Sequence, residues 1–534
     1  MFSISSRYRR PRRDRGIALL SVIALLLVFV IFAGAVVVQM SQEVNSVHND
    51  GVSNRALVAA DAGVRGMMVA IEESLSKAGP LPGPQNYTYP EAVGSPTVSY
   101  ASQIIGQWDS LPGGYQRFYL ISSTGTVVDG NQNHNRTVNV LIQAQSVTTF
   151  GSASNYDTNQ FGHPVWYTPN QRFNGPVYDG GPMHVEYDDT LTTPIFGSTV
   201  QTPNKPSWYD LNGGGTGNPA SWTSIISGGS PNFEVGGNGI GLPDPSKNMV
   251  VASEAFYGND TNLSGFGSCG SKNFGGVCMN SGTAELGGGT LTTGIFINQG
   301  NKGAAPTISS SSAGSTDTLT ITGSFGTYNI AIDFGTDTTS VCHVPCGGKP
   351  TTYIGTPSGD AGSGSGNGAI FVDGNANIAL GSEFQGQYVI AVPDFSAVNN
   401  NINIIGSGDI TYKDPTKDLL GIWANNVIMN TTASNVNIYA SIIAGYPGEA
   451  ATAGGFYNRY CNANTCTAGN QGNLTLTGSL MENMRGALGK FFSLSTWVGY
   501  NRVINYDPRL GSHPPPFYPV TGNYTIIAWD DQGQ

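Results

Sequence analysis

The stretch RGIALLSVIALLLVFVIFAGAVVVQM, residues 15–40, decides the fold of the N-terminal part of the chain. Six arginines lie between Arg7 and Arg15, whereas no charged residue occurs from Ile17 to Met40. At about 1.5 Å per residue this apolar run makes a helix of about 36 Å, which is long enough to cross the hydrocarbon core of a membrane. The arginines favour a cytoplasmic N-terminus, so the rest of the chain is expected outside.

The helical pattern continues beyond the apolar run, because no proline occurs between Pro11 and Pro80. Apolar side chains recur at helical spacing at Val64, Met67, Met68, Ile71 and Leu75. A face of small residues precedes them at Ala56, Ala59, Ala60, Ala62 and Gly63. We therefore predict one helix over residues 17–78, about 90 Å long, with half in lipid and half available to carry a domain.

Gly16 followed by IALLSVIALLL resembles the class III leader and helix of type IV pilins and pseudopilins. The resemblance implies a leader over residues 1–16, cleavage by a prepilin peptidase between Gly16 and Ile17, and methylation of Ile17. The segment Ala59–Arg65, AADAGVR, is similar to PilX-like minor pilins. Major pilins carry a glutamate at the fifth mature position, where this chain has Ser21. The K-type tip pseudopilin also lacks this glutamate. Ser21 therefore implies a low-copy or tip subunit.

Two other interpretations of the N-terminus remain open. The helix could be an uncleaved membrane anchor. It could also be a secretory signal cut near Ala33-Gly-Ala35. An ordinary signal, however, has an apolar core of about 7–15 residues, and this cut would leave the long helical remainder without a role.

Composition predicts a turn-rich β protein for the rest of the 534 residues, because 73 are glycine and 11% are charged. The net charge is −11, with 24 basic and 35 acidic side chains. Removal of residues 1–16 takes away six Arg and one Asp, which leaves 18 basic against 34 acidic side chains and a charge of −16. Such a surface disfavours general nucleic-acid coating, although a local basic groove remains open.

The six cysteines form three close pairs: Cys269 and Cys278, Cys342 and Cys346, and Cys461 and Cys466. In an exported chain this pattern favours three local disulfides, each of which closes a loop. Zinc is the competing interpretation for Cys342-His343-Val-Pro-Cys346, but no suitably spaced second pair stands nearby. We predict no metal and no cofactor.

Strand patterns at 115–124 and 137–147 predict a small antiparallel sheet over residues 79–150, packed on the outer half of the helix. Two strands alone are marginally stable. We expect the third from the C-terminus, where Asn523–Trp529 reads as an apolar strand and residues 516–534 return to this head. The intervening residues are then an insertion.

The insertion divides into a loop-rich β region over 151–365 and a region of short alternating strands over 366–515. Turn residues between the short strands predict a parallel β-solenoid, and their uneven spacing leaves a sandwich open. The fold class is α+β. We expect the serines Ser309–Ser312 to be flexible.

Motifs at Gly478–Ala487, Gly499–Arg509 and Pro514–Pro519 resemble a family of large pilin-like bacterial proteins of uncharacterised function. The architecture also resembles large competence pilins in which a β-solenoid is inserted into the pilin head. That resemblance implies DNA capture at a pilus tip.

No sequence motif for catalysis stands out, since none of the six histidines belongs to a recognised metal or triad pattern. We predict a non-enzymatic minor pilin of the cell surface, with the inner membrane, other pilins, the pilus assembly machinery and a prepilin peptidase as partners. Its ligand is DNA or a surface glycan. Arg485, Tyr500 and Arg502 are the candidate ligand residues, as a basic strip beside a ring that stacks on bases. The alternatives are a membrane-anchored surface protein and a carbohydrate-cleaving β-solenoid outside any pilus.

Overall fold

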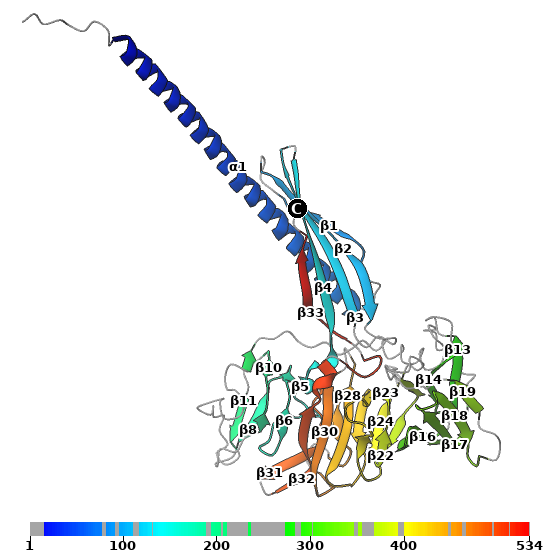
Figure 1. Ribbon diagram of the computed structural model, residues 1–534. Coiled ribbons are helices and arrows are strands. Elements are labelled where there is room, and N and C mark those ends of the chain that lie inside the picture. Colours follow the sequence, from blue (N-terminus) through cyan, green and yellow to red (C-terminus); the bar gives the residue numbers. More distant parts are fainter. Residues whose placement is uncertain are drawn as a thin grey trace, which may run out of the picture.

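The computed structural model describes residues 15–76, 82–90, 95–109, 117–130, 132–187, 194–203, 207–210, 233–235, 273–283, 290–301, 303–346, 351–354, 368–392, 400–446, 450–461, 466–493, 496–511, 513–518 and 520–532. The N-terminal element is a single helix, α1 (Arg15–Ser76), which projects from the rest of the molecule (Figure 1). Its 62 residues span about 93 Å at the helical rise. The apolar side chains from Leu19 to Val47 are exposed, and this helix is long and apolar enough to cross a membrane. The predicted long helix is confirmed.

The outer half of α1 packs on a small antiparallel sheet, as predicted. The strand order is β1-β2-β3-β4-β33. The bounds are β1 (Gln85–Thr88), β2 (Thr97–Asp109), β3 (Arg117–Asp129), β4 (Gln132–Ser146) and β33 (Val520–Asp531). The helix buries Val52, Ala56, Ala60, Val64, Met67 and Ile71, which recur every three or four residues. Opposite them the sheet buries Tyr119, Ile121, Val138, Val140 and Ile142.

The C-terminal strand closes this head, which consists of the outer half of α1 and the five-stranded sheet. β33 pairs antiparallel with β4, and Val520 lies opposite Ser146. Arg136 on β4 joins three elements, because Nη1 donates to Ser53 Oγ of α1 at 3.0 Å and Nε donates to Asp531 Oδ1 of β33 at 3.2 Å. Because Val520 lies opposite Ser146, the chain enters and leaves the insertion at neighbouring points.

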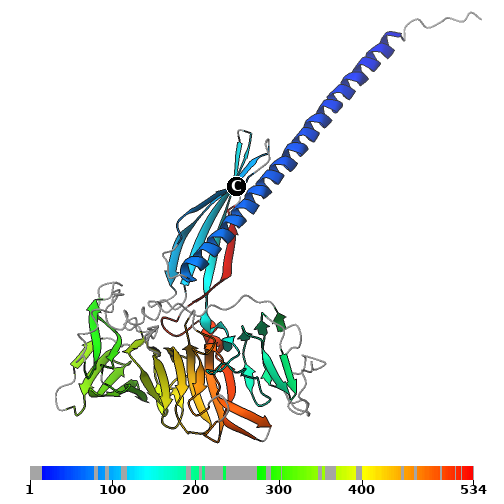
Figure 2. The same cartoon turned by 180° about the vertical axis from the view of Figure 1, so that it is seen from behind.

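The described residues between 147 and 518 form the β domain, which lies below the head in both views (Figures 1 and 2). Its first long sheet contains, in chain order, β5 (Ser152–Tyr156), β6 (Arg172–Asn174), β7 (Val177–Asp179), β9 (Ile195–Phe196), β10 (Val200–Thr202), β12 (Phe233–Val235), β13 (Gly276–Thr283), β14 (Thr290–Asn298), β20 (Ala369–Asp373), β22 (Ser382–Phe384), β23 (Gln387–Ala391), β25 (Ile410–Tyr412), β26 (Leu419–Ala424), β28 (Val436–Ala444), β30 (Asn470–Met484), β31 (Gly489–Ser493) and β32 (Thr496–Tyr506). Its second contains β15 (Thr307–Ala313), β16 (Thr316–Gly323), β17 (Gly326–Asp333), β18 (Thr338–His343), β19 (Thr351–Ile354), β21 (Ala376–Ala379), β24 (Asn401–Ile405), β27 (Asn426–Met429) and β29 (Phe456–Asn458). A separate pair joins β8 (His184–Tyr187) and β11 (Ser207–Asp210). The 3₁₀ turns η1 (Val147–Thr149) and η6 (Pro508–Gly511) contact each other at the side of the β domain that faces the head.

Most pairings in the long sheets are parallel and in register, so like residues stack from strand to strand. One buried apolar column consists of Ile295, Ile370, Ile390, Ile422, Ile442 and Leu480. Another consists of Ile410, Ile438, Leu476, Ile504, Phe173 and Phe196. A solenoid requires such parallel stacking, whereas an antiparallel sandwich does not have it.

Asparagines form hydrogen-bonded ladders along the same strands. Asn403 Nδ2 donates to Asn377 Oδ1 at 3.2 Å, and Asn426 Nδ2 donates to Asn401 Oδ1 at 2.9 Å. Identical amides meet because the parallel strands are in register, and an amide side chain can both donate and accept. These ladders give the asparagines that interrupt the strand patterns a structural role.

Two expectations for the insertion differ from the structure. Strands on both sides of the predicted boundary at residue 365 pair with each other, since β14 pairs with β20 and β5 pairs with β30. The serines Ser309–Ser312 lie in β15, where they pair with β16, and Ser310 Oγ donates to the buried Asp317 at 2.5 Å. The expected flexibility there is wrong, because cross-strand pairing fixes the serines.

Two predicted disulfides are present, Cys342–Cys346 and Cys461–Cys466. The third predicted pair involves Cys269, which lies outside the described residues.

Candidate functional site

A cavity of about 260 Å³ opens where the first strands of the insertion meet its last strands. One wall is the 159–171 loop between β5 and β6, and the other is the β31–β32 hairpin with the segment 485–488 before it. Parallel pairing of β5 with β30 and of β6 with β32 brings these walls together. Both cysteines of the Cys461–Cys466 disulfide also line the cavity, so this bridge holds part of its rim.

Aromatic and amide side chains occur on both walls. Phe491 and Trp497 are opposite neighbours in the hairpin, and Trp166 comes from the 159–171 loop. The amides are Asn159, Asn170, Gln171 and Asn501. Asn501 ties the walls together, because its Nδ2 donates to the Asn170 carbonyl at 2.7 Å and to Asn473 Oδ1 at 3.0 Å. Such a cavity presents flat apolar faces together with groups that can donate and accept.

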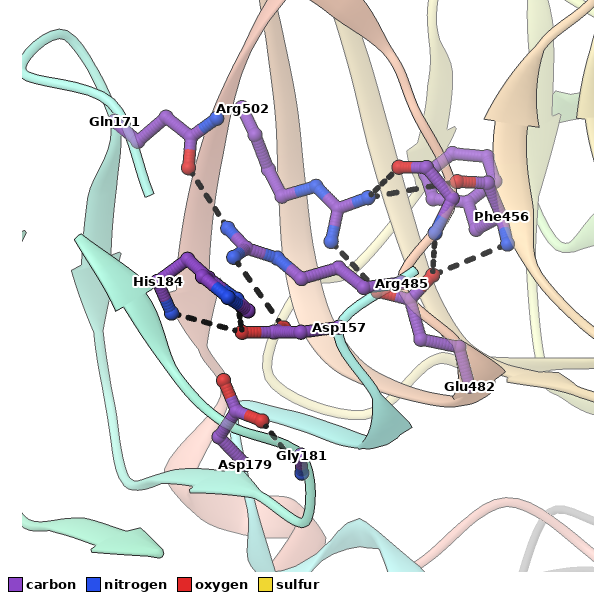
Figure 3. A network of polar contacts seen from close by, with 10 residues as sticks. Asp157, Gln171, Asp179, Gly181, His184, Phe456, Glu482, Arg485 and Arg502 are labelled. Atoms are coloured by element: carbon purple, nitrogen blue, oxygen red, sulfur yellow. Dashed lines mark hydrogen bonds and ion pairs between the residues drawn. The ribbon is translucent and has the colours of Figure 1, made fainter. Parts of the chain in front are cut away.

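Arg485 forms the buried floor of the cavity (Figure 3). Its guanidinium carbon lies 3.2 Å from the centre of the Tyr167 ring, and Nη2 donates to Gln171 Oε1 at 2.9 Å. Nη1 lies 3.7 Å from Asp157 Oδ1. The positive charge of Arg485 is therefore compensated by a carboxylate and an aromatic face.

A second buried ion pair stands beside the first (Figure 3). Arg502 Nη1 donates to Glu482 Oε1 at 2.7 Å, and Nη2 donates to the Gly486 carbonyl at 2.8 Å. Glu482 Oε2 accepts from the backbone nitrogens of Phe456 at 3.1 Å and Gly486 at 3.2 Å. This pair is hydrogen-bonded on all sides and holds the segment after β30 in place.

Burial shifts the pKa values of the carboxyl groups near the cavity. It raises the pKa of Asp157 to about 6 against the opposing effect of Arg485. Burial, followed by the charge of Asp157, holds the pKa of Asp179 well above its usual range. Burial raises the pKa of Glu186, which lines the cavity, to about 7.

The candidate residues Arg485, Tyr500 and Arg502 all line this cavity, but they do not form the predicted surface strip. Their exposed fractions are 1%, 3% and 2%, and the Tyr500 hydroxyl donates to the Ala433 carbonyl at 2.6 Å. The stacking of bases on Tyr500 is therefore a wrong expectation, because the ring is buried and its hydroxyl is bonded. Sequence reasoning did not identify Trp166, Asn170, Glu186 or Trp497. No local sequence motif marks these four positions, and Trp497 lies far from the other three in the chain.

Comparisons with known proteins place few constraints on this chain. No family model matches, and no curated protein matches. The resemblance to PilX-like pilins is not supported by a family match. Among solved structures, the chain is similar to the crystal structure of the competence-associated pilin ComZ from Thermus thermophilus. That match has 10% identity and a TM-score of 0.31, and it covers 90% of this chain and 97% of the other.

Proposed function

We propose that this chain is a minor type IV pilin-like subunit that displays its β domain for binding at the cell surface. The observation that carries the proposal is α1, because one unbroken helix has an exposed apolar half and an outer half buried in a head sheet. The apolar half suits a membrane before assembly and the core of a fibre after it. An uncleaved anchor would have no need for helix and sheet to form one rigid unit.

Processing and position within the fibre belong to the same proposal. A prepilin peptidase cuts between Gly16 and Ile17, Ile17 is methylated, and the assembly machinery then packs the helix against other pilins. Ser21, in place of the usual glutamate, favours a low-copy subunit near the tip. A large β domain on every subunit would hinder helical packing, which favours the same position.

Binding, rather than catalysis, suits the cavity best. Glycoside hydrolysis uses a pair of carboxyl groups across the cleft. Among the described residues that line the cavity, Glu186 is the one acidic side chain. Asp157 does not line the cavity and forms an ion pair with Arg485. We therefore propose a display protein with DNA or a surface glycan as its ligand class.

Shearing of filaments tests the assignment to a fibre. The chain and its Gly16→Leu variant are expressed in cells that assemble pili, and sheared filaments are probed with antibody. We expect the chain in the sheared fraction and the variant in the membrane, with the Gly83→Ala control behaving like the parent, since Gly83 lies outside α1 and an added Cβ there meets no atom within 4 Å. Recovery of the parent chain in membranes alone, under conditions that release other pilins, would support a surface anchor instead.

A further inference from the structure

We propose that the cavity between the 159–171 loop and the β31–β32 hairpin binds an uncharged saccharide, as a single ring or the terminal ring of a glycan. This inference deepens the proposed function, because it rests on the β domain being displayed for binding. Three properties of the cavity carry it: unpaired donors, aromatic faces and compensated charge.

Three buried nitrogen donors at the cavity have no hydrogen-bond partner among the described residues. Nε1 of Trp497 and Nδ2 of Asn170 come one from each wall, and the third is Nη1 of Arg485, which has an ion pair with Asp157 at 3.7 Å. A buried donor without an acceptor is unfavourable, so a ligand with acceptor oxygens would be stabilised there. Sugar hydroxyl oxygens accept hydrogen bonds, and their O–H groups can donate to Asn or Gln carbonyl oxygens.

The aromatic side chains complement the other surface of a sugar. A pyranose ring has faces of C–H groups, which carry small positive partial charges, and aromatic faces are negative. Trp166, Phe491 and Trp497 supply such rings from both walls. The combination of ring faces with neighbouring amides is the chemistry that a saccharide requires.

Charge compensation favours an uncharged ligand over a phosphate or a nucleic acid. Among the basic side chains that line the cavity, Arg485 and Arg502 are each paired with a buried carboxyl group, at 3.7 Å and 2.7 Å. Lys490 is exposed, and its Nζ lies 5.2 Å from the centre of the Phe492 ring. Nucleic-acid affinity depends on cations available to phosphates. The ionised form of Glu186 would also repel an anion in the cavity.

Size limits the ligand to a small group. The cavity of about 260 Å³ lies below the range of about 300–1,000 Å³ that holds drug-sized ligands. A single ring or a chain end suits this volume better than the interior of a polymer.

Calorimetric titration of the full mature chain tests the proposal. The chain is held in a zwitterionic detergent without a sugar headgroup and titrated with glucose, galactose, mannose, N-acetylglucosamine and N-acetylgalactosamine. We expect one-to-one binding of at least one of these sugars. Trp497→Phe, which keeps a ring but removes the N–H donor, should weaken it about tenfold, as the loss of one hydrogen bond predicts. Trp497→Ala should weaken sugar binding further than Trp497→Phe does. Asn170→Ala should also weaken sugar binding by a detectable amount.

The matched control is Trp529→Phe, because Trp529 is exposed on β33 in the head, outside the β domain. Its affinity should equal that of the parent, and thermal unfolding should show that each variant is folded. Failure of all five sugars to bind, or equal affinity in folded Trp497→Ala, would overturn the proposal. So would single-stranded DNA binding that is lost in Trp497→Ala when no sugar binds.

The two proposals fail separately. Sugar binding by a chain that never enters filaments would leave the cavity assignment intact and reject the fibre. A chain that enters filaments but binds no sugar would support the fibre assignment and reject the saccharide site.

Discussion

Single residues in the β domain show how buried charge is accommodated. The buried ion pair of Arg502 with Glu482 carries backbone hydrogen bonds on both partners, so desolvation is offset by several directed contacts. Arg485 instead combines an ion pair with an aromatic face. Both arginines thus position the segment that lines the cavity rather than offering free charge.

Arg502→Met should reduce the free energy of unfolding by about 3–5 kcal/mol, because it leaves Glu482 as a buried charge without its partner. Denaturant unfolding of the detergent-solubilised chain measures this change. Arg459→Met is the matched control, since Arg459 is exposed, and its effect should stay within about 0.5 kcal/mol. Equal stability of the two variants would show that the ion pair contributes little.

Glu186 should make stability depend on pH near neutrality. Its pKa is about 7 in the folded chain and 4.5 as a free side chain, so between these values the folded state holds more protons than the unfolded state. The contribution of Glu186 to stability is therefore greatest below about pH 4.5 and falls as the pH rises to about 7.

Glu186→Gln removes this titration. Thermal unfolding at pH 4 and at pH 8 gives the stability of the variant minus that of the parent at each pH. This difference should be more favourable to the variant at pH 8 than at pH 4. A parent-to-variant difference that does not change with pH would contradict the raised pKa.

At the level of secondary-structure elements, the contact of α1 with β3 depends on small residues. A Cβ added at Gly125 of β3 would overlap the Ala56 carbonyl oxygen, and one added at Gly63 of α1 would overlap Ser123 and Tyr100. Helix and sheet can approach closely because these positions have no side chain.

Gly125→Ala should destabilise the head by about 1–3 kcal/mol, because the strand must move away from the helix. Hydrogen exchange of α1 and β3 measures the loss of protection. Gly51→Ala on the same helix is the control, since no atom lies within 4 Å of its added Cβ, and alanine favours the helix. Unchanged exchange in Gly125→Ala would mean that the contact is loose.

Elements with strong periodicity were predictable, and those whose pattern depends on distant partners were not. The helix is clear because its apolar face repeats over many turns. Strand β2 was missed because one of its buried positions is Ser102, which breaks the apolar alternation. The cavity could not be predicted because Gln171 and Arg485 meet across 314 residues. No local pattern records which parallel strands will pair.

In the whole molecule, one chain passes from the head into the β domain and back again. Val520 lies opposite Ser146, and Thr148 Oγ1 donates to the Leu510 carbonyl at 2.9 Å, so the two crossings are joined at the side of the β domain that faces the head. The head is therefore completed only by the last residues of the chain.

Removal of residues 520–534 should open the head while leaving the β domain protected, because β4 loses its neighbour and Arg136 loses Asp531. Hydrogen exchange should increase in β4 and in α1 from Val52 to Ile71. Truncation after Gln532 is the control and should change neither. Loss of protection throughout the β domain would show that the two parts unfold together.

Mass spectrometry of the N-terminus of the native protein tests the central claim most directly. The account predicts a mature chain that begins at Ile17 and carries a methyl group on its amine. A chain that still begins at Met1, or one cut after Ala35, would contradict the assignment to a pilin-like fibre.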